Sequence, residues 1–170
     1  MTRFMGTHLN RVDAKGRVSV PAPFRAALRA HGEAAQDAGA ADIILRPSHT
    51  YPCIEGWPAH VFHALAAPLD RLDLFSDQQE DMAAAIYASA MTVEADREGR
   101  IVLPETLARH AQLKDAALFM GLGRMFQIWE PGAGERRLVE ARGRARSITL
   151  PAAPAGAVRD GRAPGAGGDA

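Results

Sequence analysis

Residues 12–21 read VDAKGRVSVP, and a closely similar stretch, EADREGRIVLP, occupies residues 94–104. Asp13, Gly16, Arg17 and Pro21 of the first copy recur as Asp96, Gly99, Arg100 and Pro104, and apolar residues match at Val18/Ile101 and Val20/Leu103. With each identity near average usage, a chance match of this kind is on the order of one in a million per start position. The repeat therefore indicates two duplicated units within one chain.

Each copy has the sequence features of a turn followed by a strand and a helix. An Asp can accept hydrogen bonds from the backbone two residues on, and Gly adopts a positive φ. We therefore interpret Asp13, Gly16, Asp96 and Gly99 as turn-organising residues. Alternating apolar residues then predict a strand, and the proline suits the first turn of a helix. Apolar stretches at 43–45, 53–54, 117–120 and 126–129 predict further strands.

The predicted fold class is α+β, mainly β. Neither half has enough elements to bury a core alone, so the two halves are expected to pair. The predicted units are a first domain at 7–55, a helical linker at 56–92, a second domain at 93–136, a basic helical extension at 137–150 and a disordered Ala/Gly/Pro-rich tail at 151–170. The first repeat helix is expected to end at Gly32. A linker helix is expected with Pro58 near its start, and Ser76 with Gln79 forms a capping box for a second one.

The charge is balanced overall but uneven along the chain. Twenty basic and twenty acidic side chains give a formal net charge of zero, which argues against indiscriminate coating of nucleic acid or membrane. Residues 1–30 carry six basic side chains and one acid, whereas residues 33–82 carry nine acids and two bases. The basic segment contains the first copy of the repeat, so a locally basic surface is expected there.

Several classes of protein are disfavoured. A single cysteine, Cys53, excludes an intrachain disulfide and fits a reducing compartment. Neither a signal-type apolar run nor a stretch of 18 apolar residues occurs, so a cytoplasmic protein without a membrane partner is expected. The spacing of His49, Cys53, His60 and His63 is a poor match to zinc patterns. No conventional catalytic or nucleotide-binding motif stands out, and we expect no metal, cofactor, small-molecule substrate or enzymatic activity.

The twofold Asp-x-x-Gly-Arg unit, in register with its strand and proline, resembles the MraZ family of bacterial transcription regulators over residues 1 to about 145. The resemblance implies two SpoVT/AbrB-like swapped-hairpin halves that form one pseudo-symmetric β-barrel with flanking helices. It also implies a nucleoid-associated, ring-shaped and octamer-like homo-oligomer. Such a ring would bind double-stranded DNA at repeated G-rich boxes of the cell-division and cell-wall gene cluster. The family motif falls on Asp13, Arg17, Asp96 and Arg100, whereas the tail from about 151 has no expected counterpart.

Basic residues of the two loops and of the nearest helix are the predicted DNA contacts: Arg11, Lys15, Arg17, Arg25, Arg97 and Arg100. Arginine is suited to guanine O6 and N7, which favours Arg17 as a base reader, whereas Arg11 and Lys15 are better suited to phosphates. For Arg17 and Arg100 the alternative is an ion pair with the Asp of the same turn. For Arg25 the alternative is a solvated helix face. Glu94 and Glu98 make the second loop less basic, so DNA reading is expected to rest mainly on the first copy.

Two other functions stay open. One is an antitoxin-like protein-interaction module of AbrB fold without its own promoter specificity, for which the arginines between 136 and 146 and the tail are candidate contacts. Those arginines are more typical of a solvated, salt-bridged surface, and auxiliary phosphate binding is the less favoured alternative. The other function is an enzyme that uses the His/Cys cluster, which the absence of a standard motif disfavours.

Overall fold

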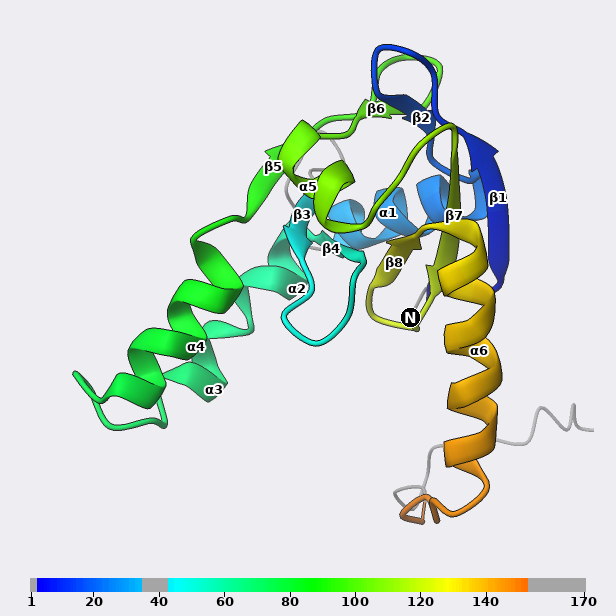
Figure 1. Cartoon of the computed structure of the whole chain (residues 1–170). Coiled ribbons are helices and arrows are strands. Elements are labelled where there is room, and N and C mark those ends of the chain that lie inside the picture. Colours follow the sequence, from blue (N-terminus) through cyan, green and yellow to red (C-terminus); the bar gives the residue numbers. More distant parts are fainter. Residues whose placement is uncertain (1–2, 35–42, 153–170) are drawn as a thin grey trace, which may run out of the picture.

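Each repeat forms the same series of elements in the computed structural model, which describes residues 3–34 and 43–152 (Figure 1). The first half contains β1 (Thr7–Arg11), β2 (Arg17–Ser19), α1 (Ala22–Ala34), β3 (Ile43–Pro47) and β4 (Ile54–Pro58). The second contains β5 (Met91–Val93), β6 (Arg100–Val102), α5 (Glu105–His110), β7 (Ala116–Gly121) and β8 (Phe126–Trp129). Between them lie α2 (Ala59–His63), α3 (Ala66–Leu69) and α4 (Asp77–Tyr87), and α6 (Pro131–Ala145) follows.

The strands pair across the two halves. The six-stranded antiparallel sheet has the order β1-β7-β8-β4-β3-β5, so the first strand of each half lies beside the third strand of the other. The order is unchanged when the two halves are exchanged, which makes the sheet pseudo-symmetric. A separate two-stranded ribbon pairs β2 with β6. Each half therefore needs the other to satisfy its backbone hydrogen bonds.

The α+β class is confirmed, although the helices hold more of the described residues than the strands do. A closed barrel is not formed by the strand pairings of residues 3–34 and 43–152, because the larger sheet is open at β1 and β5. Barrel closure remains a prediction.

Both faces of the central strands are buried, which explains their continuous apolar sequences. On one face, Phe119 and Phe126 of the sheet join Val18 and Ile101 of the ribbon and Phe24 of α1 in the main core. On the other face, Ile44 joins a cluster with the linker helices, while Leu118 and Met120 pack against α6. The ribbon is consequently held on the core by its inward residues, and Figure 1 shows the ribbon at one end of the molecule.

The capping box is confirmed, because the Ser76 hydroxyl accepts a hydrogen bond from the Gln79 amide at 3.1 Å. The helix of the first repeat continues past Gly32 to residue 34, so the predicted end at Gly32 is wrong. Trp57 and Pro58 complete β4, which therefore crosses the predicted boundary at 55, and the helix begins at Ala59. Proline fits either role, since its fixed φ suits the end of a strand and the start of a helix.

Residues 137–145 of the predicted basic extension at 137–150 belong to a longer helix, whereas residues 146–150 lie beyond its end. The helix α6 begins at Pro131, and the Glu130 side chain caps it by accepting hydrogen bonds from the amides of Gly132 and Ala133 at 3.1 and 2.8 Å. Most of the predicted tail at 151–170 lies outside the described residues.

The close packing of β4 on β8 leads to a stability prediction. Gly56 lies opposite Phe126, and a Cβ at position 56 would overlap the fully buried Phe126 ring. Gly56→Ala is therefore expected to lower the free energy of unfolding by roughly 1–3 kcal/mol, as measured by urea denaturation. Gly32→Ala is the control, because nothing lies within 4 Å of its added Cβ and it is helical; it should stabilise by about 0.5–1 kcal/mol. Equal stabilities of the two variants would contradict this packing.

Candidate nucleic-acid interface

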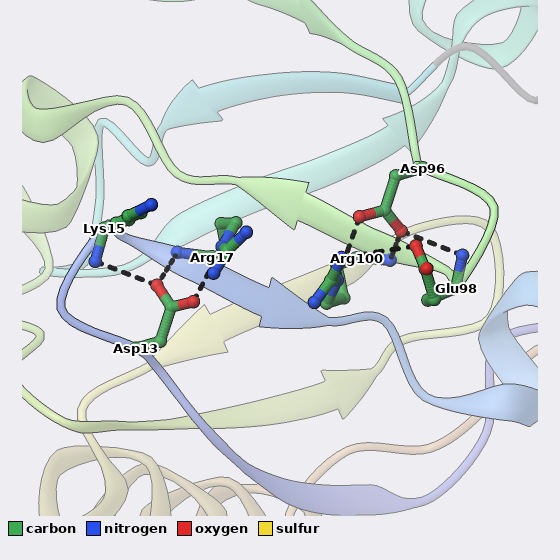
Figure 2. Close-up of polar contacts among 6 residues, drawn as sticks. All are labelled: Asp13, Lys15, Arg17, Asp96, Glu98 and Arg100. Carbon is green, nitrogen blue, oxygen red and sulfur yellow. Dashed lines mark hydrogen bonds and ion pairs between the residues drawn. The ribbon is translucent and has the colours of Figure 1, made fainter.

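The exposed face of the β2–β6 ribbon carries the two arginines of the repeated motif. Arg17 is paired with Val102, and Arg100 with Ser19, so the two arginines occupy diagonal positions on the same face. Diagonal neighbours in an antiparallel pair lie about 7–8 Å apart. Val18 and Ile101 point the other way, into the core. Figure 2 shows the two arginines on adjacent strands, with the Asp13 and Asp96 loops at opposite ends of the ribbon.

The first loop is a tight turn organised by Asp13. Its backbone carbonyl accepts from the Gly16 amide at 3.0 Å, and Gly16 has a φ of 74° that favours glycine. One carboxylate oxygen, Oδ1, accepts from the amides of Lys15 and Arg17, both at 2.9 Å. The other, Oδ2, accepts from Nε of Arg17 at 2.7 Å. Asp13 therefore both closes the turn and fixes the direction of the guanidinium.

The second loop repeats this geometry with one addition. Asp96 Oδ1 accepts from the amides of Glu98 and Arg100 at 3.0 and 2.8 Å, and Oδ2 accepts from Arg100 Nε at 2.9 Å. In addition, Glu98 accepts a hydrogen bond from Nη2 of Arg100 at 3.2 Å. No protein group of the described residues accepts from either Nη of Arg17. Both arginines are thus held by an Asp at Nε, but Arg17 keeps both Nη groups free whereas Nη2 of Arg100 is bonded to Glu98.

The electrostatics of the loops follow from these contacts. The backbone hydrogen bond from Arg17, followed by its side-chain bond, lowers the pKa of Asp13, and that from Arg100 likewise lowers the pKa of Asp96. The side-chain bond and charge of Asp96 raise the pKa of Arg100, and the charges of Glu98 and Asp13 add to this.

Arg25 contacts the second loop from α1. Its Nη1 donates to the Val20 carbonyl, and its side chain lies against Gly99, where a Cβ would overlap the Arg25 Cδ and Nε. Gly99 is buried and has a φ of 78°, so only glycine both fits the turn and leaves room for Arg25. The structure therefore gives Arg25 a role in positioning the loop, which the sequence did not indicate.

The remaining predicted contacts lie around the ribbon. Arg11 ends β1, Lys15 lies in the first loop and Arg97 lies in the second loop, and all three side chains are exposed. None of the three forms an ion pair with a carboxylate of residues 3–34 and 43–152. Their cations are consequently available to an external anion.

The described residues give no support to a metal site. They contain no group of three or more His, Cys, Asp or Glu side chains that could hold a metal ion. Burial, followed by the nearby charge of Glu55, raises the pKa of the Cys53 thiol to about 12, so the thiolate is rare at neutral pH. As for membranes, the helices that the structure describes are all too short or too polar to cross one.

Acid titration tests the turn geometry. A lowered carboxylate pKa contributes stability above the ordinary value of 3.8, and that stability is lost as the pH falls through the folded value. The double variant Asp13→Asn/Asp96→Asn should therefore be less stable than the wild type at neutral pH but lose less stability below pH 3.8. Urea midpoints on both sides of pH 3.8 measure this difference. Glu105→Gln, which removes one carboxylate of an exposed ion pair, is the control, and its urea midpoint should change with pH as that of the wild type does. If the urea midpoints of all three proteins changed equally with pH, the assignment of Asp13 and Asp96 to the turns would be refuted.

Comparison with known proteins places these loops in a family. The family described as "MraZ protein, putative antitoxin-like" matches residues 3–84 and 86–136. The protein named transcriptional regulator MraZ of Gluconacetobacter diazotrophicus is 64% identical over 152 residues, which cover 89% of this chain and 94% of the relative. The protein of the same name from Gluconobacter oxydans is 52% identical over 166 residues, 98% and 99% of the two chains. The chain belongs to the MraZ family.

Proposed function

We propose that this chain is a sequence-specific DNA-binding transcriptional regulator that reads guanines with the outward arginines of its β2–β6 ribbon. The observation that carries the proposal is the pairing of Arg17 Nε with Asp13, which leaves both Nη groups available. Two parallel Nη donors match O6 and N7 of guanine in the major groove. The printed name of the relatives, transcriptional regulator, supports the same function.

The shape of the ribbon supports entry into the major groove. That groove is about 12 Å wide in B-DNA and admits a two-stranded ribbon. The diagonal separation of about 7–8 Å between the arginine positions corresponds to roughly two base-pair steps of about 3.4 Å. Arg17 and Arg100 are therefore placed to reach two bases of one short G-rich box, while Arg11, Lys15 and Arg97 contact the flanking phosphates.

The Asp–Arg pairs support base reading as well as the formation of the turns. An arginine that is free in solution must lose side-chain freedom when it binds a base, at a cost of about 0.5–1.5 kcal/mol. Asp13 removes part of that freedom before binding, because it fixes Nε at 2.7 Å. Preorganised donors also favour bidentate geometry, since the guanidinium plane is already set.

A single ribbon provides few contacts, so we propose that the chain acts as a ring-shaped homo-oligomer, octamer-like as in the family. Linked sites convert each further contact into an intramolecular event, and avidity can exceed single-site affinity by about 10²–10⁴. Ribbons displayed around a ring suit DNA boxes that are repeated at about one helical turn. We propose that the boxes bound by this chain belong to the cell-division and cell-wall gene cluster. Nucleoid association would follow, with no cofactor or catalytic step required.

Binding titrations test the base reader. Full-length protein should bind DNA with spaced G-rich repeats more tightly than scrambled DNA at every salt concentration tested. Arg17→Ala should lose about 1–3 kcal/mol per contact and most of its preference, because each bidentate pair discriminates by that amount. Arg109→Ala is the matched control, since this exposed arginine of α5 is paired only with Glu105; it should bind like the wild type. A folded, assembled Arg17→Ala protein with wild-type preference would refute the role of Arg17.

The second loop offers an independent test. Glu98 occupies Nη2 of Arg100 at 3.2 Å and adds a negative charge beside the proposed DNA surface. Glu98→Gln is therefore expected to increase affinity for the repeats, whereas Glu140→Gln, which removes the carboxylate of an exposed ion pair with Arg144 on α6, should not. Fluorescence anisotropy at two salt concentrations measures both variants. If Glu98→Gln weakens binding, then the acidic side chain assists Arg100 and the two loops do not differ as proposed.

The antitoxin-like description of the family favours a second candidate, a protein-interaction module without promoter specificity. The same titration separates the two functions, because this candidate predicts equal affinity for repeated and scrambled DNA.

A further inference from the structure

Phe75 is the most exposed large apolar side chain among the described residues, at 91% exposure. It follows Leu74, which is 73% exposed, in the connection between α3 and α4. Its φ of 66° is an outlier for a bulky side chain and marks a local constraint. Neither the core nor the ribbon uses this residue.

The surrounding structure fixes the Leu74–Phe75 tip in place. The Ser76 amide donates to the Asp73 carbonyl at 3.0 Å, and the Ser76 hydroxyl caps α4. The helices are joined to the sheet by a hydrophobic cluster in which Ile44 of β3, Leu69 and Ile86 are buried. Figure 1 shows α3 and α4 projecting from the strands, with the connection between them at the far end. The Phe75 side chain is consequently presented to the outside on a supported element.

The tip is acidic. Residues 70–81 contain five acids and one base: Asp70, Asp73, Asp77, Glu80 and Asp81 against Arg71. An apolar anchor inside an acidic rim is typical of a protein contact rather than of DNA binding, because phosphates would be repelled.

A complementary pocket lies on the body of the molecule. It has a volume of about 290 Å³. Val61 and Ala64 give it an apolar wall, and its other side chains are Arg3, His31, His60 and Arg124. Arg3 and Arg124 form no ion pair within residues 3–34 and 43–152, and no carboxylate lines the pocket. The pocket therefore suits an apolar group that is accompanied by negative charge.

We infer that Phe75 of one copy inserts into this pocket of a second copy, with the acids of the tip facing Arg3 and Arg124. Phe75 does not fill the pocket of its own chain, because it is almost fully exposed. An aromatic side chain that leaves water on docking buries about 150–250 Å², and a supported anchor loses little freedom. Charge complementarity fixes which surfaces meet.

Such a contact is head-to-tail, since the two surfaces differ, and repeated contacts generate a closed ring or an open filament. The contact itself does not depend on DNA binding. Only the use of the resulting assembly in DNA binding rests on the proposed function. The contact gives a role to the acidic connection between α3 and α4 and to Arg3 and Arg124, none of which belongs to the ribbon.

Light scattering coupled to size exclusion, on full-length protein without DNA, tests the contact. Phe75→Gly removes the ring and tolerates the positive φ, so the variant should be at least as stable as the wild type while its dissociation constant rises by about tenfold or more. Leu150→Ser, which removes another exposed apolar side chain after α6, is the control and should assemble normally. Arg124→Asp should weaken assembly, and adding Asp73→Arg should restore it.

The outcomes separate the two proposals. A wild-type protein that is monomeric at all concentrations refutes both this contact and the proposed ring. A wild type that assembles, with an equally assembled Phe75→Gly variant, refutes only the contact. Loss of assembly in Arg124→Asp without rescue by Asp73→Arg refutes the pairing of these charges.

Discussion

The antiparallel pairing of β2 with β6 is the interaction on which both the fold and the candidate site depend. It joins the halves at their turns, since the amides of Val20 and Leu103 donate to the carbonyls of Gly99 and Gly16, each at 2.9 Å. Its inward residues complete the core, and its outward residues are the arginines of the repeat. The same hydrogen bonds therefore join the two halves of the chain and set the spacing between the two proposed base readers.

Duplication explains why the two loops are alike, but the loops have diverged where the fold permits. The Asp–Gly–Arg framework is constrained in both copies by identical hydrogen bonds. Lys15 and Glu98 occupy corresponding positions that the turn does not constrain, because only their backbone amides take part. A cation at one position and an anion at the other change the charge around each arginine without changing its orientation. The ribbon thus presents two equally directed guanidiniums of unequal availability.

The local chemistry of the site could be predicted from sequence, and its long-range arrangement could not. Turn formation by Asp13 and Gly16 involves neighbours in the chain, so spacing alone indicates it. The pairing of Arg100 with the strand that contains Arg17 joins residues far apart in sequence, and no local pattern specifies it. The sequence predicts Arg25 as a DNA contact, with a solvated helix face as the alternative, because a helical position does not show that Gly99 leaves space beside it. The sequence predicts a helix end at Gly32, but a glycine within a helix costs only about 0.5–1 kcal/mol, and the helix continues to Ala34.

A net charge of zero is compatible with DNA binding once the charges are placed on the fold. The basic N-terminal segment supplies the first loop of the ribbon, whereas the acidic segment contributes the α3–α4 projection. Screening limits the interaction of exposed charges to about 8–10 Å at moderate ionic strength, so acids on a separate projection do not cancel cations at the ribbon. The acids of the two loops are the exceptions: Glu98 pairs with Arg100, whereas Asp13 and Asp96 are engaged by backbone amides and by Arg Nε. The negative charges of Asp13 and Asp96 therefore direct the guanidiniums, and of the two motif arginines Arg17 keeps more donors free for an external anion.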